Sequence, residues 1–451
     1  MRLTVIGTGY LGLTHAVCMA DLGHEVVAID VDERKIAMAS RGELPFFEPG
    51  LEPLLRKNLD SGRLRFASSC AEAARFGKVH FLCVNTPAAT DGQADLRFVT
   101  SAIDELASNL ISRCLVVGKS TVPPGTARSI LGRLRAAAPA GDQVDLAWNP
   151  EFLREGHAVQ DTMRPDRLVF GVASEWADAL LRQIYAEPLA AGVPGLTMDL
   201  ETAELVKLSA NAFLATRISF INAIADACQA VGADVLKLVD ALGYDERIAC
   251  RSLSPGLGFG GGCLPKDIRA FHAAAAKLGL DSVTALLAAV DAINLDRRAQ
   301  VADLTRAAVG GRLAGKRVAV LGAAFKPNSD DVRDSPSLDV CERLAQQGAT
   351  VSVHDPAALK NAAQIKPHLR YSLTIAEVAA DADVVLHLTE WSDYQTIDPY
   401  ALARIVAKPV LIDARCVLDA TMWRAAGWRV AVLGRPEECW PARSRSIEAI
   451  G

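Results

Sequence analysis

A glycine-rich segment that ends in a cysteine is the clearest chemical feature of the sequence. Residues 258–267 read GFGGGCLPKD, with four glycines in the five positions 258–262 and Cys263 directly after them. Glycine is costly in chain entropy, which makes sense where the backbone must approach a ligand closely. Pro265 suits the first turn of a helix, and a helix N-terminus beside Lys266 favours a reactive thiolate. We therefore predict that Cys263 is a nucleophile, although an arbitrary cysteine is more often a small buried hydrophobic residue.

A second set of polar residues lies in a stretch with helical periodicity. Lys207 and Asn211 are four residues apart, so they share one face of a helix. Both are hydrogen-bond donors, and together they could stabilise an oxyanion. The alternative is a solvated helix face, but the neighbouring residues are apolar and asparagine is a weak helix former.

Further polar residues follow two predicted strands. Glu151 and Glu155 lie in the segment 148–156, WNPEFLREG, and either could be a base, a ligand contact or a helix cap. Thr121 follows another strand, so we expect its hydroxyl to face the same cleft.

The first glycines of the chain have the spacing of a dinucleotide-binding loop. Residues 7–12 read GTGYLG between a strand pattern and a helix pattern, and such glycines allow a pyrophosphate to approach the helix N-terminus. Asp30 ends the next strand, where a carboxylate can bond the ribose 2′-hydroxyl and repel a 2′-phosphate. We therefore predict NAD rather than NADP, with Lys35 near the adenosine ribose; the alternative is a strand–turn–helix without a ligand.

Strand and helix patterns alternate around these residues. The near-continuous apolar strands of the first 150 residues predict a parallel sheet covered on both faces. A helical middle follows, in which residues 199–231 form one long helix and the segment 247–266 is too rich in Gly and Pro to be helical. The expected strands are 3–6, 25–30, 79–84, 114–118, 144–148, 318–321, 350–354, 383–388, 409–413 and 429–433, and the further helices are 13–22, 96–110, 235–242, 267–278 and 283–309.

The order strand, glycine, helix, strand, aspartate occurs twice, ending at Asp30 and at Asp355. We therefore predict an α/β protein with two Rossmann-like doubly wound domains joined by a long central helix and a helical region. The expected parts are an NAD-binding domain 1–198, a central region 199–310 with the cysteine loop, a C-terminal domain 311–435 and a loosely ordered tail 436–451.

The second Rossmann-like half lacks the glycine spacing of the first. Residues 322–327 read GAAFKP, and a proline at 327 would disturb the start of a helix. Lys326, Arg333 and Arg415 follow predicted strands, so they suit a second anionic ligand. The alternative is that these residues are solvated surface charges.

Composition excludes several classes of protein. The 451 residues are 50% hydrophobic and 22% charged with a net charge of −5, which disfavours a disordered chain, nucleic-acid binding and membrane-surface binding. Ten cysteines without CxxC spacing disfavour a zinc site or a disulfide framework. With no apolar run of about 18 residues and an N-terminal apolar run too short for a signal peptide, we expect no metal, no membrane span and a cytoplasmic protein.

The motifs together resemble the nucleotide-sugar 6-dehydrogenases of the UDP-glucose/GDP-mannose dehydrogenase family. They run in family order from residue 1 to about residue 420. The matching segments are 7–12 (GTGYLG), 85–87 (NTP), 120–123 (STVP), 149–156 (NPEFLREG), 204–213 (ELVKLSANAF), 258–267 (GFGGGCLPKD) and 325–337 (FKPNSDDVRDSPS). The departures are Gly262, where many members have Ser or Tyr, and Cys416, where a second Arg or Asn is common.

The resemblance implies residue roles. Cys263 is the nucleophile, Lys207 and Asn211 stabilise the oxyanion, Asp267 helps to position or activate water, and Glu151 is the base for thioester hydrolysis. The catalytic set is Cys263, Lys207, Asn211, Asp267, Glu151 and Thr121. The NAD-binding set is Gly7, Gly9, Tyr10, Leu11, Gly12, Asp30, Lys35, Thr86, Thr121, Glu155, Lys266 and Arg333. The substrate-binding set is Glu151, Phe152, Leu153, Arg154, Glu155, Lys207, Asn211, Arg247, Ser252, Leu253, Ser254, Pro255, Gly256, Phe259, Gly260, Lys326 and Arg415.

The implied reaction is a four-electron, NAD-dependent oxidation of a sugar C6 alcohol to an acid through a Cys263 thiohemiacetal and thioester. UDP-glucose is the favoured substrate; dTDP-glucose, GDP-mannose and UDP-N-acetyl sugars are alternatives. The resemblance also implies a homodimer that packs along the long helix. Two competing interpretations are a two-electron NAD-dependent hydroxyacid dehydrogenase and a non-catalytic nucleotide-sugar-binding regulator, neither of which needs Cys263 together with Lys207 and Asn211.

Overall fold

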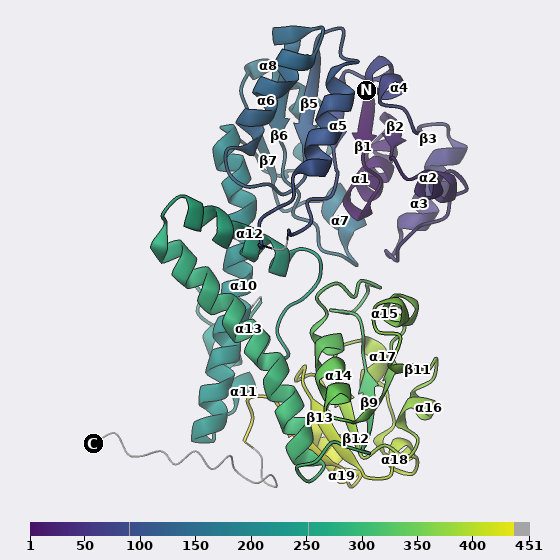
Figure 1. Ribbon diagram of the computed structural model, residues 1–451, viewed down its shortest axis with the longest axis vertical. Coiled ribbons are helices and arrows are strands. Elements are labelled where there is room, and N and C mark those ends of the chain that lie inside the picture. Colours follow the sequence, from purple (N-terminus) through teal and green to yellow (C-terminus); the bar gives the residue numbers. More distant parts are fainter. Residues whose placement is uncertain (90, 251, 437–451) are drawn as a thin grey trace. The chain divides into compact units, whose positions relative to one another are not determined.

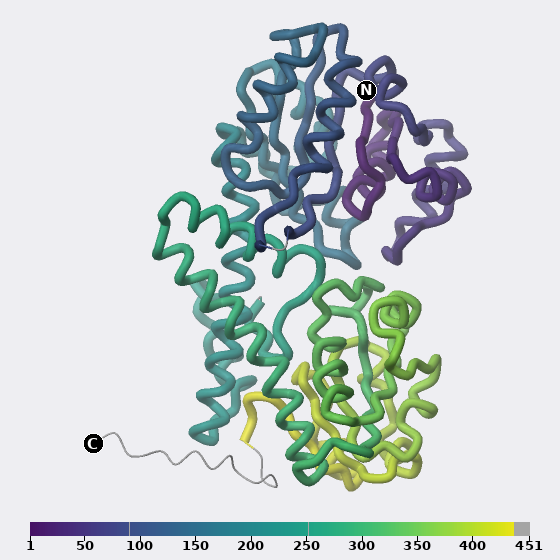
Figure 2. Tube along the Cα trace, viewed as in Figure 1, coloured from purple at the N-terminus to yellow at the C-terminus, as the bar shows by residue number. Residues whose placement is uncertain are grey.

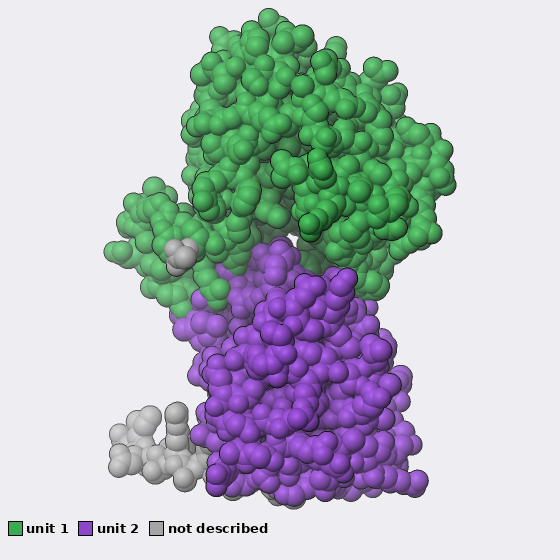
Figure 3. Space-filling model, turned by 45° about the vertical axis from the view of Figure 1, so that its right-hand side comes forward, with its two compact units in different colours: residues 1–213, 266–288 green, residues 214–265, 289–451 purple. Residues whose placement is uncertain are grey.

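The computed structural model describes residues 1–89, 91–250 and 252–436 (Figure 1). The chain divides into two compact units (Figure 3). Unit 1 comprises Met1–Phe213 and Lys266–Ala288, and unit 2 comprises Leu214–Pro265 and Ala289–Gly451. Residues 437–451 of the predicted tail, with Cys439, lie outside the described residues.

Unit 1 contains an eight-stranded sheet in its described residues, with the order β3-β2-β1-β4-β5-β6-β7-β8. Neighbouring strands are parallel except β6 and β7, which are antiparallel over two residue pairs. The prediction of a parallel sheet for the first 150 residues is confirmed, since β1 to β6 pair in parallel, and the antiparallel strand β7 lies beyond that region. The strands are β1 (Arg2–Ile6), β2 (Glu25–Ile29), β3 (Leu64–Ala67), β4 (Val79–Leu82), β5 (Cys114–Gly118), β6 (Val144–Trp148), β7 (Leu168–Val172) and β8 (Gly195–Met198).

Helices cover both faces of this sheet, as Figure 1 shows. Along β2, Val26 and Ala28 belong to one buried apolar cluster, whereas Val27 and Ile29 belong to another. This alternation places a core on each side of the sheet. The helices are α1 (Tyr10–Asp21), α2 (Glu33–Ser40), α3 (Leu51–Asp60), α4 (Cys70–Phe76), α5 (Arg97–Ala107), α6 (Thr126–Ala137), α7 (Ala158–Met163), α8 (Glu175–Ile184) and α9 (Ala186–Ala190).

The predicted long helix is α10 (Leu200–Val231), followed by α11 (Val235–Gly243), α12 (Leu264–Lys277) and α13 (Asp281–Ala308). The expectation that residues 264–266 are not helical is wrong, because α12 already begins at Leu264. Pro265 is compatible with that first turn, where its missing N–H is not needed. Among the described helices, α10 has the length and the apolar composition that a membrane span needs. Core helices of soluble proteins meet the same two criteria, so this is weak evidence for a span.

Unit 2 contains a six-stranded parallel sheet in its described part, with the order β11-β10-β9-β12-β13-β14. This is the doubly wound order, which the first six strands of unit 1 share. Figure 2 follows the chain through both sheets. The strands are β9 (Arg317–Leu321), β10 (Thr350–His354), β11 (Arg370–Tyr371), β12 (Val384–His387), β13 (Val410–Asp413) and β14 (Arg429–Val432), and the helices are α14 (Pro336–Gln346), α15 (Leu359–Ile365), α16 (Ile375–Ala379), α17 (Ser392–Gln395), α18 (Pro399–Ala403) and α19 (Ala420–Ala425).

Candidate functional site

The turn between β1 and α1 has the backbone that a pyrophosphate loop requires. Gly7 has φ +95° and donates its N–H to the Ile29 carbonyl at 2.8 Å. A Cβ on Gly12 would collide with the carbonyl of Gly7, so side chains are excluded from the turn. Helix α1 starts at Tyr10, and its N-cap residue Gly9 makes no side-chain capping bond. The N–H groups of this helix end therefore fit an anionic dinucleotide phosphate.

Asp30 fastens this loop to the end of β2. Its Oδ2 accepts the Thr8 backbone N–H at 2.7 Å and the Thr8 hydroxyl at 2.9 Å. Its Oδ1 accepts the Asp32 N–H at 2.9 Å, and the Nζ of Lys35 lies 4.0 Å from Oδ2. Asp30 and Lys35 therefore lie beside the glycine loop, where we predicted the adenosine ribose from the sequence.

Tyr10 connects the loop to the segment after Glu155. Its hydroxyl donates to the buried Glu48 carboxylate and accepts the Gly156 N–H at 3.2 Å. Glu48 also accepts the N–H groups of Gly156 and Ala158, each at 2.7 Å. Burial and the neighbouring Glu48 raise the pKa of Tyr10 above its ordinary value. Sequence reasoning missed Glu48, although a carboxylate within the apolar stretch 44–51 was a usable signal.

Predicted cofactor and catalytic residues meet beside the ends of β4 and β5. The Thr86 hydroxyl donates to the Thr121 carbonyl at 2.8 Å. The Nζ of Lys266 lies 3.5 Å from that Thr86 hydroxyl and 2.6 Å from Asp267 Oδ1. Unit 1 therefore brings four residues of the two predicted sets together.

The predicted oxyanion residues are each bonded to a carboxylate. The Nζ of Lys207 lies 3.0 Å from Glu151 Oε1, and the Asn211 amide donates to Asp267 Oδ2 at 2.7 Å. Lys207, Asn211 and Asp267 are buried, so the solvated-face alternative is excluded. The Leu153 N–H donates to Glu151 Oε2 at 2.5 Å, which fixes the second oxygen of this carboxylate.

Glu204, three residues before Lys207 on α10, binds the start of α6. Its two oxygens accept the Gly125 and Ala127 N–H groups, both at 2.6 Å. Burial raises the pKa of Glu204 to about 7, against the lowering effect of these two bonds. This contact links α10 to the segment after Thr121, and sequence reasoning assigned it no role.

In unit 2 the glycine segment is packed against the unit's own chain. Asn294 accepts the Phe259 N–H at 2.8 Å and donates to the Phe259 carbonyl at 3.1 Å. A Cβ on Gly260 would lie 2.5 Å from the Asp334 carbonyl, and one on Gly261 would lie 2.8 Å from the Phe325 ring. The expectation that the glycines serve ligand approach is therefore incomplete, since the protein itself excludes side chains there. Cys263 is exposed and directly precedes α12.

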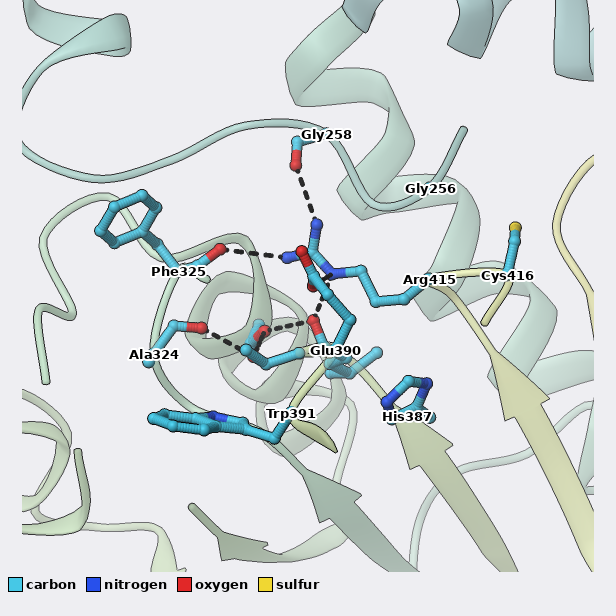
Figure 4. A network of polar contacts seen from close by, with 12 residues as sticks. Gly256, Gly258, Ala324, Phe325, His387, Glu390, Trp391, Arg415 and Cys416 are labelled. Atoms are coloured by element: carbon cyan, nitrogen blue, oxygen red, sulfur yellow. Dashed lines mark hydrogen bonds and ion pairs between the residues drawn. The ribbon is translucent and has the colours of Figure 1, made fainter. Parts of the chain in front are cut away.

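Arg415 holds this segment to the C-terminal sheet, as Figure 4 shows. Its guanidinium donates to the carbonyls of Leu388, Gly258 and Phe325 at 2.7, 3.2 and 3.3 Å. Its Nε also lies 3.1 Å from a carboxylate oxygen of Glu390, a residue that sequence reasoning missed. The prediction that Arg415 lies at the carboxyl ends of the strands is confirmed.

Behind Arg415 lies a buried pair. His387 Nδ1 is 2.8 Å from Asp413 Oδ1, which also accepts the Arg415 and Cys416 N–H groups, each at 3.0 Å. Burial raises the pKa of Asp413, but His387 and the N–H groups of Leu418 and Arg415 outweigh it and lower the pKa overall.

Three predicted basic residues are held by acidic neighbours close in sequence. Arg154 pairs with Asp161 at 2.7 Å, and Arg247 and Arg333 pair at 2.6 Å with the aspartates two residues before them. Arg333, predicted as an NAD contact, belongs to unit 2, whereas the glycine loop 7–12 belongs to unit 1. No group of three or more His, Cys, Asp or Glu in the described ranges is arranged to hold a metal ion.

Comparison with known proteins gives the family. The NAD binding domain model of the UDP-glucose/GDP-mannose dehydrogenase family matches residues 1–189, the central domain model residues 201–296, and the UDP binding domain model residues 319–420. The chain belongs to this UDP-glucose/GDP-mannose dehydrogenase family. The resemblance read from the motifs, the α/β fold and the NAD cofactor are thereby confirmed, and the protein is an NAD-dependent oxidoreductase with a nucleotide-sugar substrate.

Individual relatives and solved structures are consistent with this family assignment. The chain is 40% identical to a UDP-glucose 6-dehydrogenase of Rhizobium meliloti, over 97% of this chain and 100% of the relative. It is similar to the structure of a UDP-glucose dehydrogenase from Pyrobaculum islandicum, with TM-score 0.89 and 37% identity over 96% of this chain and 98% of that one. A UDP-D-ManNAc dehydrogenase from Pyrococcus horikoshii gives TM-score 0.85 and 25% identity over 96% of this chain and 99% of that one.

Proposed function

We propose that this dehydrogenase oxidises the C6 alcohol of UDP-glucose to the carboxylate of UDP-glucuronate, with two NAD per sugar. The observation that carries the proposal is the pair of buried contacts Lys207–Glu151 and Asn211–Asp267, in the same unit as the dinucleotide loop. Cys263 stands four residues before Asp267 in the chain. UDP-glucose is favoured over other nucleotide sugars because the relatives at 37–40% identity bear UDP-glucose dehydrogenase names, and the UDP-N-acetyl sugar enzyme is more distant.

The residues divide the proposed chemistry among them. Residues 7–12 and Asp30 would hold NAD, which would supply the hydride acceptor for each of the two oxidations at C6. Lys207 and Asn211 stabilise the C6 oxygen while a base of the site takes the hydroxyl proton. The Cys263 thiolate then adds to the aldehyde carbon to give a thiohemiacetal, whose oxidation leaves a thioester. Water attacks that thioester and loses a proton to Glu151, which releases the carboxylate and the thiol.

The remaining residue sets keep the roles that the resemblance implies. We propose that Thr86, Thr121, Glu155 and Lys266 complete the NAD site, with Arg333 as a further contact. The proposed substrate contacts are residues 151–155, 252–256, Phe259, Gly260, Lys326 and Arg415, with Arg247 reaching the site of a neighbouring subunit. The proposed domains are 1–198, 199–310 and 311–435.

We further propose a homodimer that packs along α10. Phe213, Leu214 and Phe220 of this helix are exposed apolar side chains, which supports an interface there. Light scattering of the native protein should give the dimer mass, and Phe220→Glu should shift it toward the monomer. We propose the cytoplasm as the compartment, since the described cysteines are thiols.

The decisive test counts NADH per sugar. We expect two NADH per UDP-glucose and no released aldehyde, and Cys263→Ala should lose acid formation by several orders of magnitude while keeping some alcohol–aldehyde activity. One NADH per sugar would favour the two-electron dehydrogenase instead. A panel of UDP-glucose, dTDP-glucose, GDP-mannose and UDP-N-acetyl sugars, compared by kcat/KM, tests the substrate.

A further inference from the structure

Lys119 is a buried cation of unit 1 that the proposed chemistry does not use. It follows β5 directly and is 7% exposed. Its Nζ donates to the side-chain Oδ1 of Asn149 at 2.9 Å, to the Asn149 carbonyl at 3.3 Å and to the Tyr185 hydroxyl at 3.4 Å. All three acceptors are neutral.

A buried ammonium group needs a reason, because removing a charge from water is costly even where hydrogen bonds are made. The pKa of Lys119 is lowered to about 8, chiefly by burial and also by the charge of Lys207, while Cys83 and Glu151 act in the opposite direction. A neutral side chain of similar length would fill the same space without this cost. The charge and the donor geometry of Lys119 therefore point to a purpose beyond packing.

The residue that Lys119 holds is Asn149, which is 1% exposed. The Asn149 N–H donates to the Gly118 carbonyl at 2.8 Å, and its side-chain amide donates to the Val169 carbonyl at 2.9 Å. Its Oδ1 also accepts the Tyr185 hydroxyl at 2.7 Å. Lys119 takes the remaining carbonyl and shares Oδ1, so the chain is fixed on every side at the end of β6.

Two residues later the chain reaches Glu151. Pro150 between them has no N–H and so cannot bond to a neighbouring strand there. The direction in which Glu151 leaves the sheet therefore depends on how firmly Asn149 is held. Glu151 must face Lys207, whose Nζ lies 3.0 Å from it, to act as the proposed base.

We propose that Lys119 is a positioning residue for Glu151: through Asn149 it sets the place of this carboxylate for the attack of water on the thioester. The inference rests on the proposed function, because it assigns Lys119 to the last step of that reaction. It predicts that loss of Lys119 slows hydrolysis and leaves both hydride transfers nearly intact.

The experiment compares the full-length enzyme with Lys119→Met by rapid mixing with NAD and UDP-glucose. We expect a burst approaching two NADH per active site at a rate within about threefold of the native rate, followed by turnover reduced about 10–100-fold. Mass spectrometry of the quenched Lys119→Met enzyme should show the acyl adduct on the peptide that contains Cys263. Lys119→Arg, which keeps the charge, should restore part of the turnover.

Thr4→Val is the matched control. Thr4 is buried in the same sheet and its hydroxyl is 2.7 Å from His80 Nδ1, so this variant also loses a buried hydrogen bond. We expect it to lower the melting temperature without an adduct. A Lys119→Met enzyme that is destabilised like Thr4→Val but turns over at the native rate, or that slows the burst itself, would overturn the proposal.

Tyr185→Phe provides a second test if Lys119→Met does not fold. It removes the hydroxyl that donates to Asn149 and accepts from Lys119 but keeps the charge of Lys119, so we expect turnover to fall a few-fold with some adduct present. Native turnover without adduct would overturn the proposal. Failure of the proposed function is separate, since the unmodified enzyme would then produce one NADH per sugar.

Discussion

The turns after the first strand of each Rossmann-like sheet are built alike but lead to different structures. In unit 1 the Gly7 N–H donates to the Ile29 carbonyl, and Asp30 accepts the Thr8 N–H. Helix α1 begins at Tyr10, three residues after Gly7. The helix N-terminus therefore lies directly beside the turn.

In unit 2 the Gly322 N–H donates to the His354 carbonyl at 2.8 Å, and Asp355 accepts the N–H groups of Ala323 and Ala324. Gly322 has φ +111°, so the glycine is needed here too. The next helix, α14, begins only at residue 336. The long connection between them carries Lys326 instead of a helix end.

Asp30 and Asp355, the aspartates of these two turns, also differ in the number of hydrogen bonds that they accept. In the described part of the chain Asp355 accepts five hydrogen bonds, including one from the Trp391 indole, whereas Asp30 accepts three. A carboxylate has about four acceptor sites, so Asp355 has no capacity for a ribose while Asp30 retains some. A shared turn thus becomes a dinucleotide site only when a helix starts beside it and its aspartate keeps an acceptor site.

The largest expected effect distinguishes a catalytic residue of unit 1, Lys207, from a binding residue of unit 2, Lys326. Lys207→Ala should lower kcat about 100–1,000-fold, because an oxyanion donor acts mainly where charge develops. Lys326→Ala, on the connection of unit 2, should raise the KM for UDP-glucose and leave kcat within about twofold. Steady-state kinetics of both variants test the contrast, and a Lys207→Ala enzyme with native kcat would break it.

Gly12→Ala tests the close approach in the turn of unit 1. Its Cβ would collide with the carbonyl of Gly7, so we expect the Kd for NAD to rise by about 100-fold, measured by calorimetry, with UDP affinity within about twofold. Gly132→Ala on α6 is the control, because a Cβ there meets open space. Unchanged NAD affinity in Gly12→Ala would contradict the role of this glycine.

The aspartates should give opposite results. Asp30→Ala should reduce an NAD-over-NADP preference of about 100-fold by about tenfold in kcat/KM, because the repulsion of the 2′-phosphate is lost. Asp355→Ala should keep that preference and lower the free energy of unfolding by about 2–4 kcal/mol, since it leaves buried N–H groups without acceptors. An equal loss of cofactor preference in both variants would show that the two carboxylates do not differ in function.

The smallest effect on catalysis is expected from two buried carboxyl groups, Glu204 and Asp413, whose contributions to stability depend on pH in opposite ways. The pKa of Glu204 is raised to about 7, so between about pH 4.5 and 7 the folded protein keeps a proton that the unfolded chain releases. Its contribution is therefore lost as pH rises through this range, by about 1–3 kcal/mol. Calorimetry at pH 5.5 and 8 should show this loss, and Glu204→Gln should flatten it.

Asp413 of unit 2 provides the contrast. Its pKa is lowered, so its contribution is present above the pKa of the unfolded chain and is lost only in acid below that range. Asp413→Asn should destabilise the protein equally at pH 5.5 and 8. If Glu204→Gln shows the same pH dependence as the native protein, Glu204 is not the group responsible.

Much of the fold could be predicted because most core strands are buried on both faces and bounded by turn residues. Residues 114–118, 144–148 and 350–354 form strands with the predicted bounds. The spacing of Lys207 and Asn211 indicated a shared helix face without any knowledge of the partners. Such local patterns are visible in sequence because they depend on neighbours within one helix turn or one strand.

The partners of buried polar groups could not be predicted in the same way. Glu48 binds N–H groups 108 and 110 residues away, and Glu204 binds N–H groups 77 and 79 residues away. The partner atoms are backbone groups, which every residue has, so no residue type marks them. Lys119 was missed for the same reason, since its acceptors include a main-chain carbonyl of Asn149.

The cysteine thiols differ in exposure, which allows Cys263 to be labelled selectively. Among the described cysteines Cys250 and Cys263 are exposed, whereas burial raises the pKa of others, such as Cys18 and Cys83, to about 12. Maleimide reagents react with accessible thiolates, so the buried thiols are protected at neutral pH. With Cys250 and Cys439 replaced by serine, Cys263 becomes the one exposed thiol of the described chain. Stoichiometric alkylation would then count working active sites, and a fluorophore placed there would report occupancy by nucleotide sugar directly.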